Sequence, residues 1–301
     1  MIVFASSITD PAMYAKAAER GIRLVAEPGS EVLANAAAGS IFRSYNLILD
    51  TVAERDDLEA LVLLHQDAEI ASPGFCDTLR QALSDPDVGV VGCVGAVGVR
   101  SIAWWEGSVT WASFVHRYDE LGGGELPALS WTNGDLPAFA QTGEVDTVDG
   151  FVLVLSPWVV RNVRFDESLG RLHGYDFDFC LQVRAAGRKV VTADFKVVHH
   201  HSLELVSHPE TWLAAHMRVA EKWQGRMPGA TPAGGDWEQR ARRGEAEASL
   251  ARTQAVAAML HADARVAQLE RRLDAMTESA SWRLTAPLRR LAGARRALRR
   301  R

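Results

Sequence analysis

The stretch LVLLHQDAE, residues 61–69, decides the fold. Four aliphatic residues run directly into His65, Gln66 and Asp67. A continuous apolar run of this length is typical of a strand that is covered on both faces of its sheet. A histidine and an aspartate are costly to bury unless something pairs with them. The stretch therefore predicts a core strand whose C-terminal end carries functional polar side chains.

Segments typical of strands and of helices alternate on both sides of this stretch. We expect strands at 2–7, 22–27, 58–67 and 88–98, and helices at 11–20, 38–53 and 72–83. Asp10 is the expected N-cap of the first helix, with Pro11 at its first position. This alternation predicts an α/β fold with a mixed, mostly parallel sheet and helices on both faces. Ligands of such sheets bind beyond the C-terminal ends of the strands, where His65 and Asp67 are expected.

Beyond residue 98, the expected domain contains an insertion and four further segments. Residues 99–147 are rich in tryptophan and glycine, and we expect hairpins and loops near the site. The core is expected to resume at 148–160, a helix to end at Gly187 within 173–191, a strand to span 196–202, and a helix to span 211–223. The strand at 196–202 again ends in polar residues, the three histidines 199–201.

The composition changes near residue 228, which predicts three parts. These are an α/β domain at 1–228, a linker at 229–240 and a helical arm at 241–301. Apolar residues between Ala255 and Met276 alternate in spacing between four and three, which indicates a weak coiled coil and a homodimer formed through the arm. Residues 283–301 contain many arginines and no acid. This tail is either a solvated helix or a basic amphipathic end that lies on an anionic membrane surface.

Composition and charge restrict the class of protein. The chain has 301 residues and a formal net charge of −5, which gives no reason to expect nucleic acid as a partner. Three widely spaced cysteines indicate neither a disulfide framework nor a zinc site, and a reducing cytosol is the simplest setting. The first ten residues, MIVFASSITD, lack the features of a signal peptide. We therefore expect a cytoplasmic protein, held at the inner face of the membrane if the basic tail binds there.

Polar residues at several expected strand ends suggest one shared site. Besides His65 and Asp67, they include Asp149 with Gly150, Asp176, and the histidine triplet. Carboxylates and imidazoles that meet from separate strand ends suit a divalent cation. Each residue also has a structural alternative, since an acid can cap a helix and a histidine triplet is often a surface feature.

The order of these motifs resembles the family-2 glycosyltransferases of the GT-A fold, in the branch that carries HQD where most relatives carry Asp-x-Asp. HGYDFDFCLQVRAAG, residues 173–187, is similar to the family's W-G-E-D-x-D-L-x-x-R-x-x-x-G stretch. The resemblance covers about residues 1–225. It implies a UDP- or dTDP-linked sugar donor, a Mn²⁺ or Mg²⁺ cofactor, and a glycan or lipid-linked acceptor, as in cell-surface polysaccharide biosynthesis.

The resemblance also implies roles for individual residues. Asp67 and one of His199, His200 and His201 would bind the metal, and Asp176 would be the general base of an inverting transfer. The donor would be bound by Ser6, Glu27, Arg43, Asn46, His65, Gln66, Asp67, Asp149 and Gly150. Two positions depart from the family pattern: His65 replaces an acid of Asp-x-Asp, and Tyr175 replaces the glutamate before Asp176.

These two departures keep a rival open, a decayed GT-A-fold protein that binds or scaffolds without turnover. A nucleotidyltransferase on a related sheet would show a glycine-rich loop with lysine or arginine after the first strand. SSITDPAMY, residues 6–14, contains no such loop.

Overall fold

The computed structural model describes residues 1–36, 38–97, 99, 108–118, 124–125, 143–200, 209–226, 259–260 and 262–286. The chain divides into two units, 1–253 and 254–301, and each is described by itself. Several predictions fall outside the described residues: His201, the linker at 229–240, the basic tail beyond residue 286, and much of the tryptophan-rich insertion.

Seven strands of the described residues form the central sheet, in the order β10-β13-β5-β12-β3-β1-β2. Their bounds are β1 Ile2–Ile8, β2 Glu31–Ala36, β3 Ala60–Leu64, β5 Val88–Gly92, β10 Gly143–Val145, β12 Val152–Leu155 and β13 Lys189–Thr192. Strand β1 is parallel to β2 and β3, whereas β12 is antiparallel to β3 and β5. Because Val152 pairs with Leu64, the start of β12 lies beside the end of β3. The expected mixed α/β sheet is confirmed.

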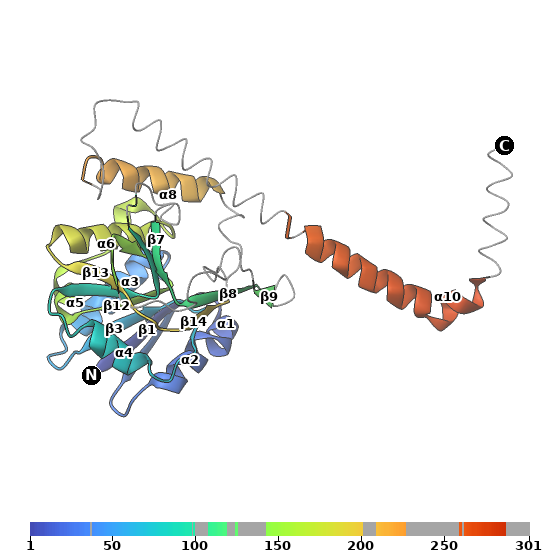
Figure 1. The fold of residues 1–301 in the computed structure, drawn as a ribbon, viewed down its shortest axis with the longest axis horizontal. Helices are drawn as coiled ribbons and strands as arrows, with labels where there is room; N and C mark the ends of the chain where they lie inside the picture. The colour runs from blue at the N-terminus through green and yellow to red at the C-terminus, as the bar shows by residue number, and fades with distance from the viewer. Residues whose placement is uncertain are drawn as a thin grey trace. The chain divides into compact units, whose positions relative to one another are not determined.

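Helices cover both faces of this sheet (Figure 1). One group comprises α1 Pro11–Lys16, α2 Ala18–Val25 and α4 Phe75–Ala82, and the other α3 Ile41–Ala53, α5 Pro157–Asn162 and α6 Tyr175–Ala185. In the first group, the Cys76 thiol donates to the Val25 carbonyl over 3.3 Å, which joins α4 to the end of α2. In the second, the Arg161 guanidinium donates to the Ala53 and Arg55 carbonyls, which joins α5 to the end of α3.

Two smaller sheets lie beyond the C-terminal ends of β3 and β5, since β4 follows β3 and β6 follows β5. One contains β4 Ala68–Ile70, β14 Val197–His199, β8 Phe114–Tyr118 and β9 Gly124–Glu125, and the other β11 Thr147–Val148, β6 Val94–Val97 and β7 Ser108–Ala112. Strand β14 is antiparallel to β4, with His199 opposite Ala68. The end of β14 therefore lies beside the segment that follows β3.

The predicted strand at 22–27 is wrong, because residues Ala18–Val25 form helix α2. Its buried residues, Ala18, Gly21, Ile22 and Val25, recur at the spacing of one helix face. The true second strand, β2, is an edge strand whose side chains are mostly exposed, so its sequence carries little strand pattern. The prediction of Asp10 as N-cap is confirmed, since its carboxylate accepts from the N–H groups of Ala12 and Met13.

The C-terminal unit is helical over residues 262–278 and again in α10, Ala280–Leu284. Ser279 separates the two segments and caps α10 by accepting from the Trp282 N–H. Six of its described large apolar residues are between 44% and 81% exposed: Met259, Val266, Leu269, Leu273, Met276 and Leu284. In the part of the chain that the structure describes, no helix is both long and apolar enough to cross a bilayer.

Candidate metal and active site

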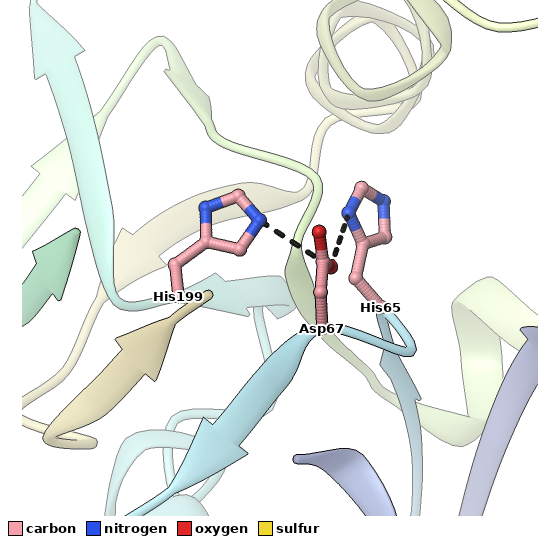
Figure 2. Close-up of side chains that lie close together, drawn as sticks. All are labelled: His65, Asp67 and His199. Carbon is pink, nitrogen blue, oxygen red and sulfur yellow. Dashed lines mark ion pairs between the residues drawn. The ribbon is translucent and has the colours of Figure 1, made fainter. Parts of the chain in front are cut away.

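The HQD motif follows β3 and provides two of three clustered side chains (Figure 2). Oδ1 of Asp67 lies 3.8 Å from Nδ1 of His65 and 3.5 Å from Nε2 of His199. The ligand atoms of the three residues all lie within 4.8 Å of one another. Two imidazoles and a carboxylate are a donor set that fits a divalent first-row metal ion.

The pairing of β14 with β4 decides which histidine of the triplet enters this cluster. The His199 side chain is 7% exposed, and its ring stacks on Phe151 with centroids 4.4 Å apart. The neighbouring His200 points away, because side chains alternate at a strand end. Its Nε2 lies 2.9 Å from a carboxylate oxygen of Glu69. Of the two described histidines, only His199 contributes to the cluster, and His201 lies outside the described residues.

The D-G-F motif, Asp149-Gly150-Phe151, directly precedes β12 and connects the cluster to α6. The His65 N–H donates to the Phe151 carbonyl over 2.9 Å, and the Gly150 N–H donates to Oδ2 of Asp176 over 2.9 Å. Oδ1 of Asp149 accepts from the Phe151 N–H over 3.2 Å. Sequence reasoning singled out Asp149 and Gly150 but missed Phe151, which follows them. Its ring and its carbonyl each contact one histidine of the cluster.

Asp176 occupies the first turn of α6, and both of its carboxylate oxygens accept backbone hydrogen bonds. Oδ2 accepts from Gly150, and Oδ1 accepts from the Phe177 N–H over 2.9 Å. Burial raises the pKa of Asp176, and the backbone N–H donors oppose that increase. A carboxylate that is fixed in direction and raised in pKa has the properties of a general base.

The Tyr175 side chain contacts the cluster and lies close enough to Asp176 to be influenced by its charge. Its hydroxyl is 2.5 Å from Nε2 of His65, so the two residues that depart from the family pattern contact each other. Burial raises the pKa of Tyr175, and nearby Tyr45 and the charges of Asp176, Asp149 and Asp67 raise it further. Three of the predicted acids therefore lie close enough to one phenol to influence it electrostatically.

Asp178, two residues after Asp176, has a structural role instead. Its side chain is 1% exposed and accepts from the Trp223 indole N–H over 2.7 Å and from Lys222 Nζ over 2.8 Å. Gln182 donates to its second oxygen over 2.8 Å. This network connects α6 to α8, Pro209–Lys222, because Lys222 ends that helix and Trp223 follows it.

Two predicted donor residues stabilise neighbouring loops. Gln66 accepts from the N–H groups of Thr9 and Asp10, each over 2.8 Å, and its amide donates to the Thr9 hydroxyl. It therefore orders the loop that follows β1. Asn46 bonds both backbone groups of Phe165 and the Glu167 carboxylate, so its amide is engaged with that segment.

The remaining predicted donor residues separate into two groups. Ser6 lies near the C-terminal end of β1, and Arg43 lies in the first turn of α3. Both are therefore at the C-terminal ends of the parallel strands, as the cluster is. Glu27 lies at the opposite, N-terminal ends of the parallel strands, where its carboxylate binds the Arg80 guanidinium at 2.6 and 2.9 Å. We correct its placement: Glu27 was expected at the end of a strand, but it follows helix α2.

Comparison with known proteins gives a family. A family model described as "Glycosyltransferase like family" matches residues 3–219. The chain is 29% identical over 203 residues to the streptomycin biosynthesis protein StrF of Streptomyces griseus, covering 67% of each. It is 26% identical over 182 residues to the O-antigen biosynthesis protein RfbC of Myxococcus xanthus, covering 57% of this chain and 13% of RfbC.

Among solved structures, the mannosyltransferase PcManGT of Pyrobaculum calidifontis, in complex with GDP-Man and Mn²⁺, is 13% identical. Its TM-score is 0.45, with 94% of this chain and 81% of that chain covered. The match to the family model extends over more than two thirds of the sequence and contains the HQD, D-G-F and HGYDFD segments. The chain therefore belongs to this glycosyltransferase-like family.

Proposed function

We propose that this protein is a metal-dependent, inverting glycosyltransferase. It moves a sugar from a UDP- or dTDP-linked donor to a glycan or lipid-linked acceptor, in the biosynthesis of a cell-surface polysaccharide. One observation supports the proposal most: Asp67 and His199 meet beside the same D-G-F motif that donates a hydrogen bond to Asp176. Membership of a glycosyltransferase-like family supports the reaction class.

The proposed cofactor is Mn²⁺ or Mg²⁺, with Asp67 and His199 as ligands. A bound cation would neutralise the charge that develops on the departing nucleoside diphosphate. The carboxylate of Asp67 supplies the hard oxygen ligand that both ions prefer. Stacking on Phe151 fixes the plane of the His199 ring, so Nε2 is held toward Asp67 before any ion arrives.

Asp176 is the proposed base. It takes the proton of the acceptor hydroxyl while that oxygen bonds to the anomeric carbon and the bond from that carbon to the diphosphate breaks on the opposite face. Attack from the opposite face inverts the anomeric configuration. The two backbone hydrogen bonds to Asp176 hold the carboxylate in one orientation, which a positioned base requires.

Two further residues are proposed donor contacts. Arg43 is an exposed cation in the first turn of α3, and the N-terminus of a helix favours a negatively charged group such as a diphosphate. Ser6 is buried near the end of β1, and its hydroxyl has no hydrogen-bond partner among the described residues. We do not retain Glu27 or Asn46 in the proposed donor site.

The test is a donor screen on the full chain. UDP- and dTDP-sugars are added with Mn²⁺, with Mg²⁺ or with EDTA, and both the melting temperature and nucleoside diphosphate release are measured. We expect stabilisation and release that need both the nucleotide sugar and the ion. Absence of both effects across the panel would instead support the rival scaffold protein.

The arm carries a separate proposal. The exposed apolar residues Val266, Leu269, Leu273 and Met276 follow a coiled-coil spacing, which supports a homodimer formed through this helix. Sedimentation at increasing protein concentration tests it, and Leu269→Glu should shift the chain to monomer. The domain bounds at 228 and 240, membrane contact by the basic tail, and the cytoplasmic location at the inner face remain predictions.

A further inference from the structure

We propose that His65 is itself a ligand of the cation and that Tyr175 positions it. The ion would then be held by two imidazoles and one carboxylate, a set that selects Mn²⁺ over Mg²⁺. The inference rests on the proposed metal dependence and extends it, because the pattern of the sequence placed His65 at the donor and gave Tyr175 no role.

The two nitrogens of the His65 ring face different partners. Nε2 lies 2.5 Å from the Tyr175 hydroxyl, and Nδ1 faces Oδ1 of Asp67 at 3.8 Å. A neutral imidazole carries one N–H and one lone pair. If the N–H is on Nε2 and donates to the phenol oxygen, the lone pair of Nδ1 points toward Asp67. Metal-binding histidines commonly donate a hydrogen bond from the N–H of the second ring nitrogen, which fixes the tautomer and the ring orientation.

Packing of the buried Tyr175 ring holds its hydroxyl in a fixed position. The residue is 6% exposed, and its ring has edge contacts with Phe42 and Tyr45, at centroid distances of 6.0 and 5.8 Å. Gly150 leaves the space that the phenol occupies, because a Cβ at that position would lie within van der Waals overlap of the hydroxyl. A group held this firmly can orient His65 rather than adapt to it.

The backbone of His65 is fixed as well. Its N–H donates to the Phe151 carbonyl over 2.9 Å, and the Phe151 ring stacks on His199. Phe151 therefore sets the relative position of both imidazoles. Their rings lie 6.0 Å apart between centroids, with Asp67 reaching both.

The separations in the cluster suit a shared ion better than direct hydrogen bonds. Asp67 lies 3.8 and 3.5 Å from the two ring nitrogens, beyond the usual range of about 2.7–3.2 Å for a hydrogen bond. Two atoms that each bind one ion at about 2.0–2.2 Å lie roughly 3–4 Å apart. Mg²⁺ demands oxygen ligands and retains water, whereas Mn²⁺, a first-row transition ion, binds oxygen ligands and also accepts imidazole nitrogen. Each added imidazole therefore favours Mn²⁺ over Mg²⁺.

The opposite tautomer gives a different role. If the Tyr175 hydroxyl donates to Nε2, the N–H lies on Nδ1 and faces Asp67. His65 would then orient the carboxylate without binding the ion. Counting the nitrogens bound to the metal separates the two arrangements.

The experiment uses the full chain, loaded with Mn²⁺ and studied by pulsed electron paramagnetic resonance and titration calorimetry. We expect two imidazole nitrogens coupled to Mn²⁺ in the wild type and one in His65→Asp. His65→Asp should also lower the ratio of the Mg²⁺ to the Mn²⁺ dissociation constant, since a hard oxygen replaces a nitrogen. Tyr175→Phe, which keeps the ring, should raise the Mn²⁺ dissociation constant by about 10- to 100-fold.

Tyr45→Phe is the matched control. It also removes a hydroxyl from a buried tyrosine beside Tyr175, but that hydroxyl has no hydrogen-bond partner among the described residues. Its Mn²⁺ affinity should equal that of the wild type. Near-ultraviolet circular dichroism and the melting temperature of the metal-free variants check that each one folds.

Three results would overturn the inference: no Mn²⁺ binding by the wild type, a single coupled nitrogen that His65→Asp leaves unchanged, or Tyr175→Phe with wild-type affinity. None of these readouts needs turnover. A two-nitrogen site without glycosyl transfer would contradict the proposed function alone. Metal-dependent transfer that leaves His65 unbound would contradict this inference alone.

Discussion

The backbone N–H of Gly150 donates to Oδ2 of Asp176 over 2.9 Å, so the start of β12 and the start of α6 share one hydrogen bond. Gly150 is followed by Phe151, which contacts both histidines of the His65–Asp67–His199 cluster. The proposed base and the proposed metal ligands are therefore positioned by consecutive residues of one short motif. Changes in this motif should affect metal binding and catalysis together, and changes elsewhere should separate them.

Asp176→Asn should strongly lower the rate of transfer while the donor still binds. The amide cannot accept the proton of the acceptor hydroxyl, so we expect kcat to fall by about 10²- to 10⁴-fold. The donor dissociation constant, measured by calorimetry with Mn²⁺, should change less than about threefold. Full activity in this variant would show that another group is the base.

Asp67→Ala should have the complementary effect. It removes the carboxylate that lies between the two imidazoles, so the ion loses its only oxygen ligand in the His65–Asp67–His199 cluster. We expect Mn²⁺ affinity to fall by at least the 10- to 100-fold that follows loss of an outer-shell partner. Thermal stabilisation by UDP- or dTDP-sugar should then no longer respond to added Mn²⁺. An unchanged Mn²⁺ response would place the ion elsewhere.

Gly150→Ala should damage both the fold and the site. The new Cβ would overlap the hydroxyl and ring of Tyr175, so the phenol must shift and its contact with His65 is disturbed. Overpacking of this kind costs about 1–3 kcal/mol of unfolding free energy. Gly74→Ala is the matched control, because its Cβ would meet only the Ser72 hydroxyl at 3.9 Å. Urea unfolding and Mn²⁺ titration of both variants test this, and equal behaviour of the two would contradict it.

Activity should fall on the acid side at a higher pH than an ordinary aspartate would cause. Burial raises the pKa of Asp176, and only its ionised form can accept a proton. The acid limb of kcat/KM should therefore lie above about pH 3.9, the usual value for an aspartate. An acid limb at or below that value would contradict the assignment.

The same shift predicts how stability depends on pH. Because the pKa of Asp176 is higher in the folded chain, the folded state holds more protons between the two values. Stability from this group is fully present below the unfolded pKa and is lost as the pH rises through the folded pKa. The unfolding free energy of the wild type minus that of Asp176→Asn should therefore fall as the pH rises. A constant difference would show that Asp176 has an ordinary pKa.

Asp178→Ala should destabilise the protein without removing the base. The change leaves the Lys222 ammonium and the Trp223 indole N–H without their acceptor in a buried place. Loss of one partner of a buried charge pair costs about 3–5 kcal/mol, and the partial exposure of Lys222 puts the expected cost near the lower end. Urea unfolding measures it. The kcat of the folded fraction should stay within a few-fold of wild type, in contrast to Asp176→Asn.

Local patterns in the sequence were sufficient for much of the fold. The apolar run before His65 predicted β3, and the Asp10-Pro11 pair predicted the start of α1, because both depend on neighbouring residues alone. The strand predicted at 22–27 was wrong because it, too, rested on neighbouring residues alone. Its short apolar pattern suits either a strand or a helix face, and packing against β4 decided for the helix.

The sequence by itself determined the family, the mixed α/β class and the set of polar residues from which the site is drawn. Only the tertiary structure decided that His199 and not His200 joins Asp67, that Glu27 lies at the far edge of the sheet, and that Tyr175 contacts His65. Those outcomes depend on strand pairing and on contacts between distant segments, such as the 110 residues that separate His65 from Tyr175. No local pattern encodes them, because the same residue types would suit several partners until the sheet brings one within reach.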